Sequence, residues 1–154
     1  MILPADLAPP IRQVVELFER FAPGDIAQLG KYYCEAAHFK DPFNAVQGVP
    51  AIERIFEHMF ERLEAPRFEV IAAFGDAQQA ILTWNFRFRL RNRWLQRPGD
   101  PDACIHGATH FLFAPDGRVR EHRDYWDAAQ EFYETMPAIG WVLRSLRHLA
   151  SATG

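Results

Sequence analysis

The stretch that decides the fold is CIHGATHFLFAPDGRVREHRDYW, residues 104–126. Near its centre stand Pro115, Asp116 and Gly117, the residue types that turn a chain sharply between two hairpin strands. Strand alternation before this turn puts Ile105, Gly107, Thr109, Phe111 and Phe113 on one face, and after it His122, Asp124 and Trp126 share a face. The stretch therefore predicts two paired strands, 104–113 and 119–126.

Working outward, two more strands are predicted upstream. In residues 80–91 the side chains of Trp84, Phe86 and Phe88 fall on one face, and Arg87, Arg89 and Arg91 fall on the other. Residues 68–73 form the preceding strand, and Gly75-Asp76 marks the turn between the two. Four strands in succession, linked by turns, indicate a meandering sheet.

The first part of the chain reads as helices. Pro9 and Pro10 open one helix, and Asp25 caps a second that carries Tyr32 and Tyr33. A short strand ends at Asp41, and a third helix runs from about residue 48 to Pro66. A further helical segment is predicted after residue 128. The order predicts one α+β domain, residues 1–154, with helices on one side of a curved antiparallel sheet and a C-terminal helical extension at about 137–150.

Composition narrows the function classes. The net charge of −3 gives no basic face for nucleic acid. No apolar run approaches a membrane span, no signal peptide is visible, and two cysteines make no disulfide framework. We expect a cytoplasmic protein without a bound metal or cofactor, since no phosphate loop, nucleotide motif or convincing metal-ligand set appears.

Two segments, 24–44 and 117–127, resemble the SnoaL-like and ketosteroid-isomerase-like branch of the nuclear transport factor 2-like superfamily. The resemblance spans roughly residues 10–136. It implies a cone-shaped fold around a cavity. It places Asp41 where the isomerases carry a catalytic aspartate, and Asp124 where limonene-epoxide-hydrolase-like members carry their general base.

The chain departs from both catalytic patterns. The oxyanion-binding tyrosine and aspartate of the isomerases correspond to Leu17 and Thr109, and a supporting tyrosine corresponds to Phe56. Only Tyr33 is kept. The arginine and second aspartate of the hydrolases fall on a strand face that is aromatic here. Neither constellation is complete, and the fold itself hosts many functions.

The predicted site is an aromatic chamber with few polar groups. The candidate catalytic residues are Asp41, His122 and Asp124. A carboxylate among rings loses hydration and is suited to accept a proton from carbon or water, with the imidazole of His122 beside it. The candidate ligand-binding residues are Tyr33, Phe56, Trp84, Phe86, Phe88, Thr109, Phe111 and Trp126.

Each candidate has a plainer interpretation. Asp41 also fits an ordinary turn aspartate, Asp124 an acid paired with arginine, and His122 a buried structural histidine. The arginines at 87, 89 and 91 fit a solvated face or a homodimer interface. We therefore expect a cofactor-free isomerase or hydrolase acting on a small apolar, oxygen-bearing molecule, with a non-catalytic ligand-binding module or a protein-interaction module as the alternatives.

Overall fold

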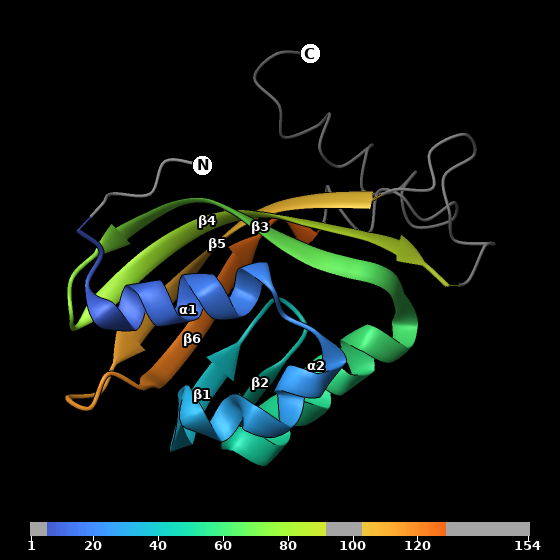
Figure 1. Ribbon diagram of the computed structural model, residues 1–154. Helices are drawn as coiled ribbons and strands as arrows, with labels where there is room; N and C mark the ends of the chain where they lie inside the picture. Colours follow the sequence, from blue (N-terminus) through green and yellow to red (C-terminus); the bar gives the residue numbers. More distant parts are fainter. Residues whose placement is uncertain (1–5, 92–102, 129–154) are drawn as a thin grey trace, which may run out of the picture.

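The computed structural model describes residues 6–91 and 103–128 (Figure 1). Three helical elements and six strands follow one another in these ranges. They are α1 (Pro9–Glu19), η1 (Pro23–Lys31), β1 (Tyr33–Lys40), β2 (Ala45–Gln47), α2 (Val49–Arg62), β3 (Leu63–Gly75), β4 (Gln79–Leu90), β5 (Ala103–Phe113) and β6 (Val119–Trp126). The C-terminal helical extension predicted at about 137–150 lies outside the described residues.

The six strands form one sheet in the order β2-β1-β6-β5-β4-β3. The antiparallel prediction is wrong for one pair, because β1 and β6 run parallel, while every other neighbouring pair is antiparallel. A parallel pair needs a long crossover, and the chain between β1 and β6 supplies one through β2, α2 and three strands. The sheet is therefore mixed, and this crossover places the N-terminal strand beside the last one.

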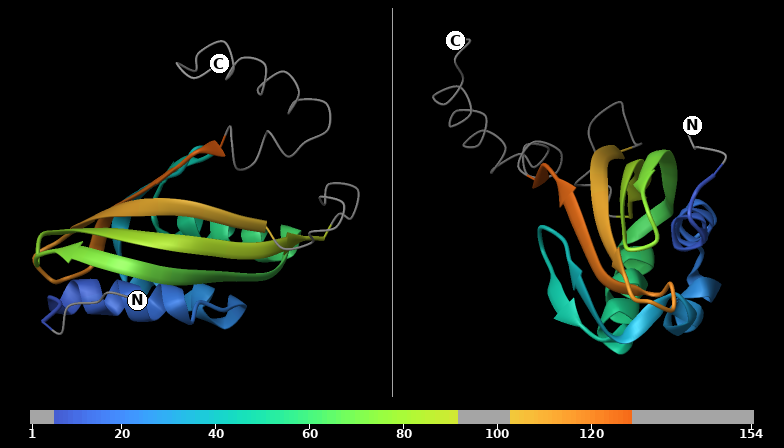
Figure 2. Two further views of the ribbon diagram at one scale, coloured as in Figure 1. Left: turned by 90° about the horizontal axis from the view of Figure 1, so that it is seen from above. Right: turned by 90° about the vertical axis from the view of Figure 1, so that its left-hand side faces the viewer.

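The sheet is curved and unclosed, and the helices lie inside its curve (Figure 2). Helix α1 packs on β3, and α2 packs on η1, β1 and β3. Prolines in the first turn start both α-helices, where the amide hydrogen that proline lacks would have no helical partner. The core that results is rich in phenylalanine, with Phe18 of α1 in ring contact with Phe56 of α2, Phe68 of β3 and Phe111 of β5.

The turn between β5 and β6 is confirmed as predicted. Its Gly117 has φ +85°, a backbone conformation that favours glycine, and its amide donates to the carbonyl of Ala114 at 2.9 Å. Strand β6 has the predicted bounds and β5 begins one residue earlier than predicted.

Upstream, the third helix ends at Arg62 and not at Pro66, which lies within β3, so this strand starts earlier than the predicted residue 68. The assignment of Tyr33 is also wrong. Tyr33 is the first residue of β1. The preceding helix, to which the prediction assigned it, is a 3-10 helix that ends at Lys31. The spacing of Ile26, Leu29 and Tyr33 fits a helix, but burial of Tyr33 beside β6 decides its conformation, as tertiary packing often does. Strand β2 was missed because three residues carry no readable alternation. None of the helices in the described ranges has the length and apolar character that crossing a bilayer requires.

Candidate functional site

A cavity of about 200 Å³ opens between α2, the β1–β2 turn and the inner face of the sheet. Half of its lining residues are phenylalanine or tryptophan, and they come both from the sheet and from the segments opposite it. The lining residues are Phe39, Asp41, Phe43, Asn44, Ile55, Phe56, His58, Met59, Leu63, Phe68, Trp84, Phe86, Phe88, Ile105, Asp124 and Trp126. A mostly apolar concave wall with few polar groups is typical of a small-molecule site.

Behind it lies a second, deeper space of about 20 Å³. Asp124 and Trp84 line both spaces, while Thr109, Phe111 and His122 line only the deep one. A space of this size is large enough for one water molecule. Asp124 therefore stands where the ligand-sized cavity meets a water-sized one.

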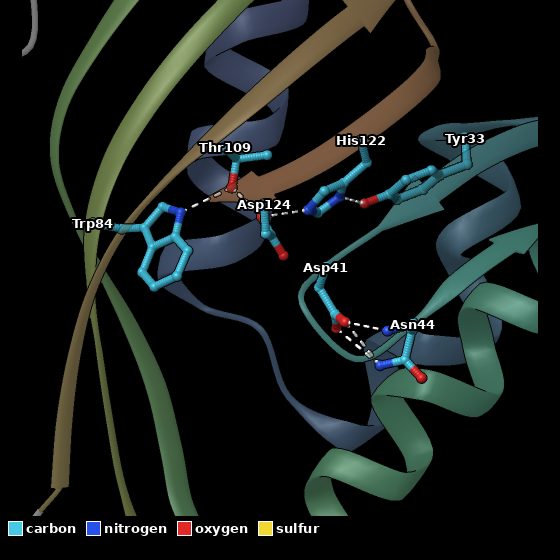
Figure 3. Close-up of polar contacts among 7 residues, drawn as sticks. All are labelled: Tyr33, Asp41, Asn44, Trp84, Thr109, His122 and Asp124. Atoms are coloured by element: carbon cyan, nitrogen blue, oxygen red, sulfur yellow. Dashed lines mark hydrogen bonds and ion pairs between the residues drawn. The ribbon is translucent and has the colours of Figure 1, made fainter. Parts of the chain in front are cut away.

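A continuous hydrogen-bonded chain runs through Asp124 (Figure 3). The indole Nε1 of Trp84 donates to the hydroxyl of Thr109 at 2.8 Å, and that hydroxyl donates to Oδ1 of Asp124. From the other side, Nε2 of His122 lies 2.9 Å from the same Oδ1, and Nδ1 lies 2.7 Å from the hydroxyl of Tyr33. Four strands contribute to this chain, because the sheet register places Trp84 beside Gly107 and Thr109 beside Asp124.

One assignment of donors and acceptors gives every group in this series of hydrogen bonds a partner. An indole nitrogen only donates, so the Thr109 hydroxyl accepts from Trp84 and its own hydrogen goes to Asp124. A neutral His122 completes the chain, with Nε2–H donating to Asp124 and Nδ1 accepting from Tyr33. Both ends thus converge on Oδ1 as acceptor, which requires that this oxygen carry no proton.

The second carboxylate oxygen of Asp124 is different. Within residues 6–91 and 103–128, Oδ2 makes no hydrogen bond, and Figure 3 shows it turned away from Thr109 and His122. The side chain is 16% exposed and lines the larger cavity. The geometry therefore fixes the carboxylate through one oxygen and leaves the other available to a bound molecule.

Tyr33 supports this arrangement from behind His122. Its side chain is fully buried and lines neither of the two spaces, although the sequence predicts it as a ligand-binding residue. Burial, and then the negative charge of Asp124, raise the pKa of its phenol well above the usual 10.0. The hydroxyl therefore stays protonated and donates to His122.

Asp41 lies at the cavity rim, and its carboxylate is occupied by its own turn. Oδ1 accepts from the amides of Phe43 and Asn44 at 2.7 and 2.6 Å, and the Asn44 side chain donates to both oxygens. This is the turn-stabilising role that an aspartate side chain often plays by accepting from the backbone amides that follow it. The fold brings both aspartates to one cavity, but only Asp124 has a carboxylate oxygen without a hydrogen bond to the described residues.

The other predicted residues divide between the two spaces. Phe56, Trp84, Phe86, Phe88 and Trp126 line the larger cavity. Sequence reasoning missed several of its lining residues, among them Phe39, Phe68, Met59 and His58. The alternation around Phe39 and Phe68 was visible, but nothing in the sequence showed that the edge of α2 carrying His58 faces this cavity.

The arginines of β4 lie on the opposite face of the sheet. Arg87 forms an ion pair with Glu69 of β3, with Nε 2.9 and 3.1 Å from the two carboxylate oxygens. This contact gives Arg87 a structural role on the outer face. Among the residues that the structure describes, no three metal-ligand side chains gather into one group.

The model of the SnoaL-like domain family matches residues 14–122. No curated protein matches the chain. Solved structures of the same fold do match, and three of them are informative about the range of functions that this fold carries.

A protein named as a SnoaL-like polyketide cyclase from Shewanella putrefaciens has a TM-score of 0.65 and 17% identity, covering 95% of this chain and 100% of its own. An epoxide hydrolase from M. tuberculosis has a TM-score of 0.64 and 14% identity, covering 90% and 91%. A protein of ketosteroid-isomerase-like fold from Catenulispora acidiphila, in complex with trimethylamine, has a TM-score of 0.64 and 12% identity, covering 81% and 91%. Identities this low show a shared fold alone.

Proposed function

We propose that this chain, which belongs to the SnoaL-like domain family, binds a compact apolar, oxygen-bearing molecule and transfers a proton to or from it without a cofactor. Asp124 is the general base. His122 and Thr109 are positioning residues that hold the carboxylate, and Tyr33 and Trp84 hold them in turn.

The observation that carries this proposal is that the two oxygens of Asp124 differ in their hydrogen bonds. Oδ1 accepts from Thr109 and His122, so the carboxylate is held in one orientation. Oδ2 faces the cavity without a hydrogen bond to the described residues. A base needs this combination of fixed position and open lone pairs to take a proton from a bound molecule.

The size of the cavity limits the ligand. Its volume of about 200 Å³ is a little above that of an engineered cavity of about 150 Å³ that binds benzene. Pockets for drug-sized molecules begin at about 300 Å³. The proposal is therefore for a ligand with one ring or a small fused pair, and a four-ring steroid exceeds the space.

In the proposed step, Oδ2 of Asp124 accepts a proton from the carbon between a carbonyl and a C=C bond, and the C–H electron pair forms an enolate. The proton is then returned to the far carbon of the C=C bond, the double bond moves next to the carbonyl, and Asp124 is regenerated, which is an isomerisation. With a water beside Oδ2 in the larger cavity, the same oxygen accepts a proton from that water while the water oxygen attacks an epoxide carbon. The C–O bond of the epoxide breaks and the released alkoxide takes a proton from solvent, which is a hydrolysis. Both reactions are compatible with the fold, which this chain shares with proteins named as a polyketide cyclase and an epoxide hydrolase.

One observation favours a non-catalytic binder as the second candidate. The two deep donors that could stabilise a developing oxyanion, Trp84 Nε1–H and the Thr109 hydroxyl, are both used within the chain of hydrogen bonds. An enzyme that forms an enolate gains much of its rate from such donors. A protein that only binds its ligand has no need of them.

A thermal-shift screen of compact ketones, lactones and epoxides, followed by turnover assays on those that bind, tests the proposal. Asp124→Asn keeps an acceptor oxygen for Thr109 and His122 and removes only the base, so binding is expected to persist while turnover falls about 10²–10⁴-fold. Asp41→Asn is the control at the cavity rim; it loses one acceptor for the Asn44 side chain but no proposed base, so its turnover is expected to stay far above that of Asp124→Asn. Binding without turnover in the wild type supports the binder, and equal turnover in both variants excludes Asp124 as the base.

We also propose a homodimer through the outer face of the sheet. Phe74 and Ile81, which pair across β3 and β4, are 58% and 40% exposed, and Tyr125 of β6 is 50% exposed on the same face. Arg87 shares that face. Exposed apolar side chains gathered beside charged ones are typical of a protein interface.

A further inference from the structure

The wall of the larger cavity has an uneven charge. None of its described lining residues is lysine or arginine, and two of them, Asp41 and Asp124, are carboxylates. His58, on the exposed edge of α2, is the one other titratable group among them. Asn44 is the other polar residue of this wall, and its remaining described side chains are apolar or aromatic. An anion thus stands in an apolar space with no protein cation facing it from this wall.

The partners of Asp124 do not neutralise it. Thr109 donates a neutral hydroxyl hydrogen bond. His122 is assigned here as a neutral ring, with Nε2–H donating to Asp124 and Nδ1 accepting the Tyr33 hydrogen, because a ring protonated on both nitrogens would leave that hydrogen without an acceptor among the described residues. The negative charge of the carboxylate is therefore held in position and left to be balanced by whatever enters the cavity.

The aromatic rings around Asp124 also favour a positively charged ligand. Eight aromatic side chains line the cavity, among them Trp84 and Trp126. The face of an aromatic ring carries negative electrostatic potential, and tryptophan attracts cations most strongly. A fixed carboxylate at the inner end of an aromatic-walled cavity is complementary to an organic ammonium ion, whose charge is diffuse and whose hydration is weak.

We infer that the ligands of this cavity include compact organic cations, tertiary or quaternary amines with an apolar body whose positive charge lies against Asp124 and the rings of Trp84 and Trp126. This inference rests on the proposed function of the cavity as a small-molecule site and adds a charge to the ligand class. The volume of about 200 Å³ admits an ammonium group joined to one ring.

Two probes of similar size test the inference by calorimetry or ligand-observed NMR. Benzyltrimethylammonium carries the charge, and propiophenone is a neutral ketone. Asp124→Asn is expected to weaken binding of the ammonium probe about tenfold or more, and to change propiophenone binding less than about twofold, because only the cation depends on the carboxylate charge. Asp41→Asn is the control for a carboxylate at the rim.

The outcomes separate the two proposals. If Asp124→Asn binds the ammonium probe as tightly as the wild type while propiophenone still binds, the cation inference is overturned and the small-molecule site stands. If neither probe binds the wild type, the cation inference and the proposed small-molecule site are both contradicted. A comparison on the wild type alone, with neopentylbenzene as the uncharged carbon isostere, needs no variant. We expect about tenfold weaker binding of the isostere, and equal or tighter binding contradicts the inference.

Discussion

The six-membered ring of the Trp84 indole on β4 lies directly against Gly107 on β5. A Cβ placed on Gly107 would stand 2.3 Å from the Trp84 ring, much closer than real carbon atoms approach. The two residues are register partners, so glycine here gives the ring the space in which its Nε1 reaches Thr109. The smallest residue of β5 thereby sets the position of a hydrogen bond that holds Asp124.

Gly107→Ala is expected to displace Trp84 and to destabilise the protein by about 1–3 kcal/mol, because the extra methyl overpacks a tight site. Chemical denaturation measures the loss. Gly30→Ala is the matched control, since a Cβ on Gly30 meets no atom within 4 Å, and we expect a change within about 0.5 kcal/mol. Equal stability of the two variants would show that the ring does not lie where the structure places it.

Thr109→Val keeps the shape of the side chain and removes its hydroxyl. The indole hydrogen of Trp84 then loses its acceptor and Oδ1 of Asp124 loses a donor, so unfolding free energy is expected to fall by about 1–3 kcal/mol. Thr109→Ser retains the hydroxyl and is expected to recover most of the loss in the same denaturation experiment. A serine variant no more stable than the valine variant would assign the effect to packing instead.

Burial of Tyr33 predicts that the free energy of unfolding falls at alkaline pH. Its pKa in the folded protein is raised, first by burial and then by Asp124. Above about pH 10 the unfolded chain releases this proton while the folded protein keeps it. The unfolded state then binds fewer protons, so stability falls as pH rises, whereas the contribution is fully present below that pH.

Tyr33→Phe removes this loss of stability at alkaline pH. The variant is expected to be less stable at neutral pH by about 1–2 kcal/mol, because Nδ1 of His122 loses its donor. The gap to the wild type is expected to narrow above about pH 10. Denaturant unfolding at both pH values measures it, and a gap that stays constant would mean that the Tyr33 hydroxyl is not buried as described.

The proposed homodimer is tested by analytical ultracentrifugation. Phe74→Glu places a charge in the outer apolar patch and is expected to shift a dimer to monomer, while Phe43→Glu, at the cavity rim, leaves the dimer intact. A wild-type protein that sediments only as a monomer at micromolar concentration would end the proposal.

Much of the sheet is readable from the sequence because its signals are local. The Pro-Asp-Gly turn and the alternation through β4, β5 and β6 gave these strands nearly to the residue. Tyr33 was misassigned because its spacing fits a helix, and only the distant β6 reveals why it is extended. The parallel pairing of β1 with β6 is also non-local, and no pattern in either strand encodes it.

The site shows the same limit. Alternation brought His122 and Asp124 to one face, and the family resemblance singled out both aspartates. The sequence suggested a turn role for Asp41 but did not decide between that role and catalysis, because the difference between the two carboxylates lies in their hydrogen-bond partners. Asn44 and its neighbouring amides satisfy Asp41 locally, while Asp124 is held by residues far away in the chain.

The most direct test of the account is deuterium exchange at the carbon next to the carbonyl of propiophenone, followed by NMR in deuterated buffer. It reports proton abstraction in the cavity without knowledge of the natural product. We predict exchange faster than in buffer alone with wild-type protein and with Asp41→Asn, and a rate about 10²–10⁴-fold lower with Asp124→Asn. Exchange by Asp124→Asn at the wild-type rate, or none above buffer with the wild type, would contradict the assignment of Asp124 as the base.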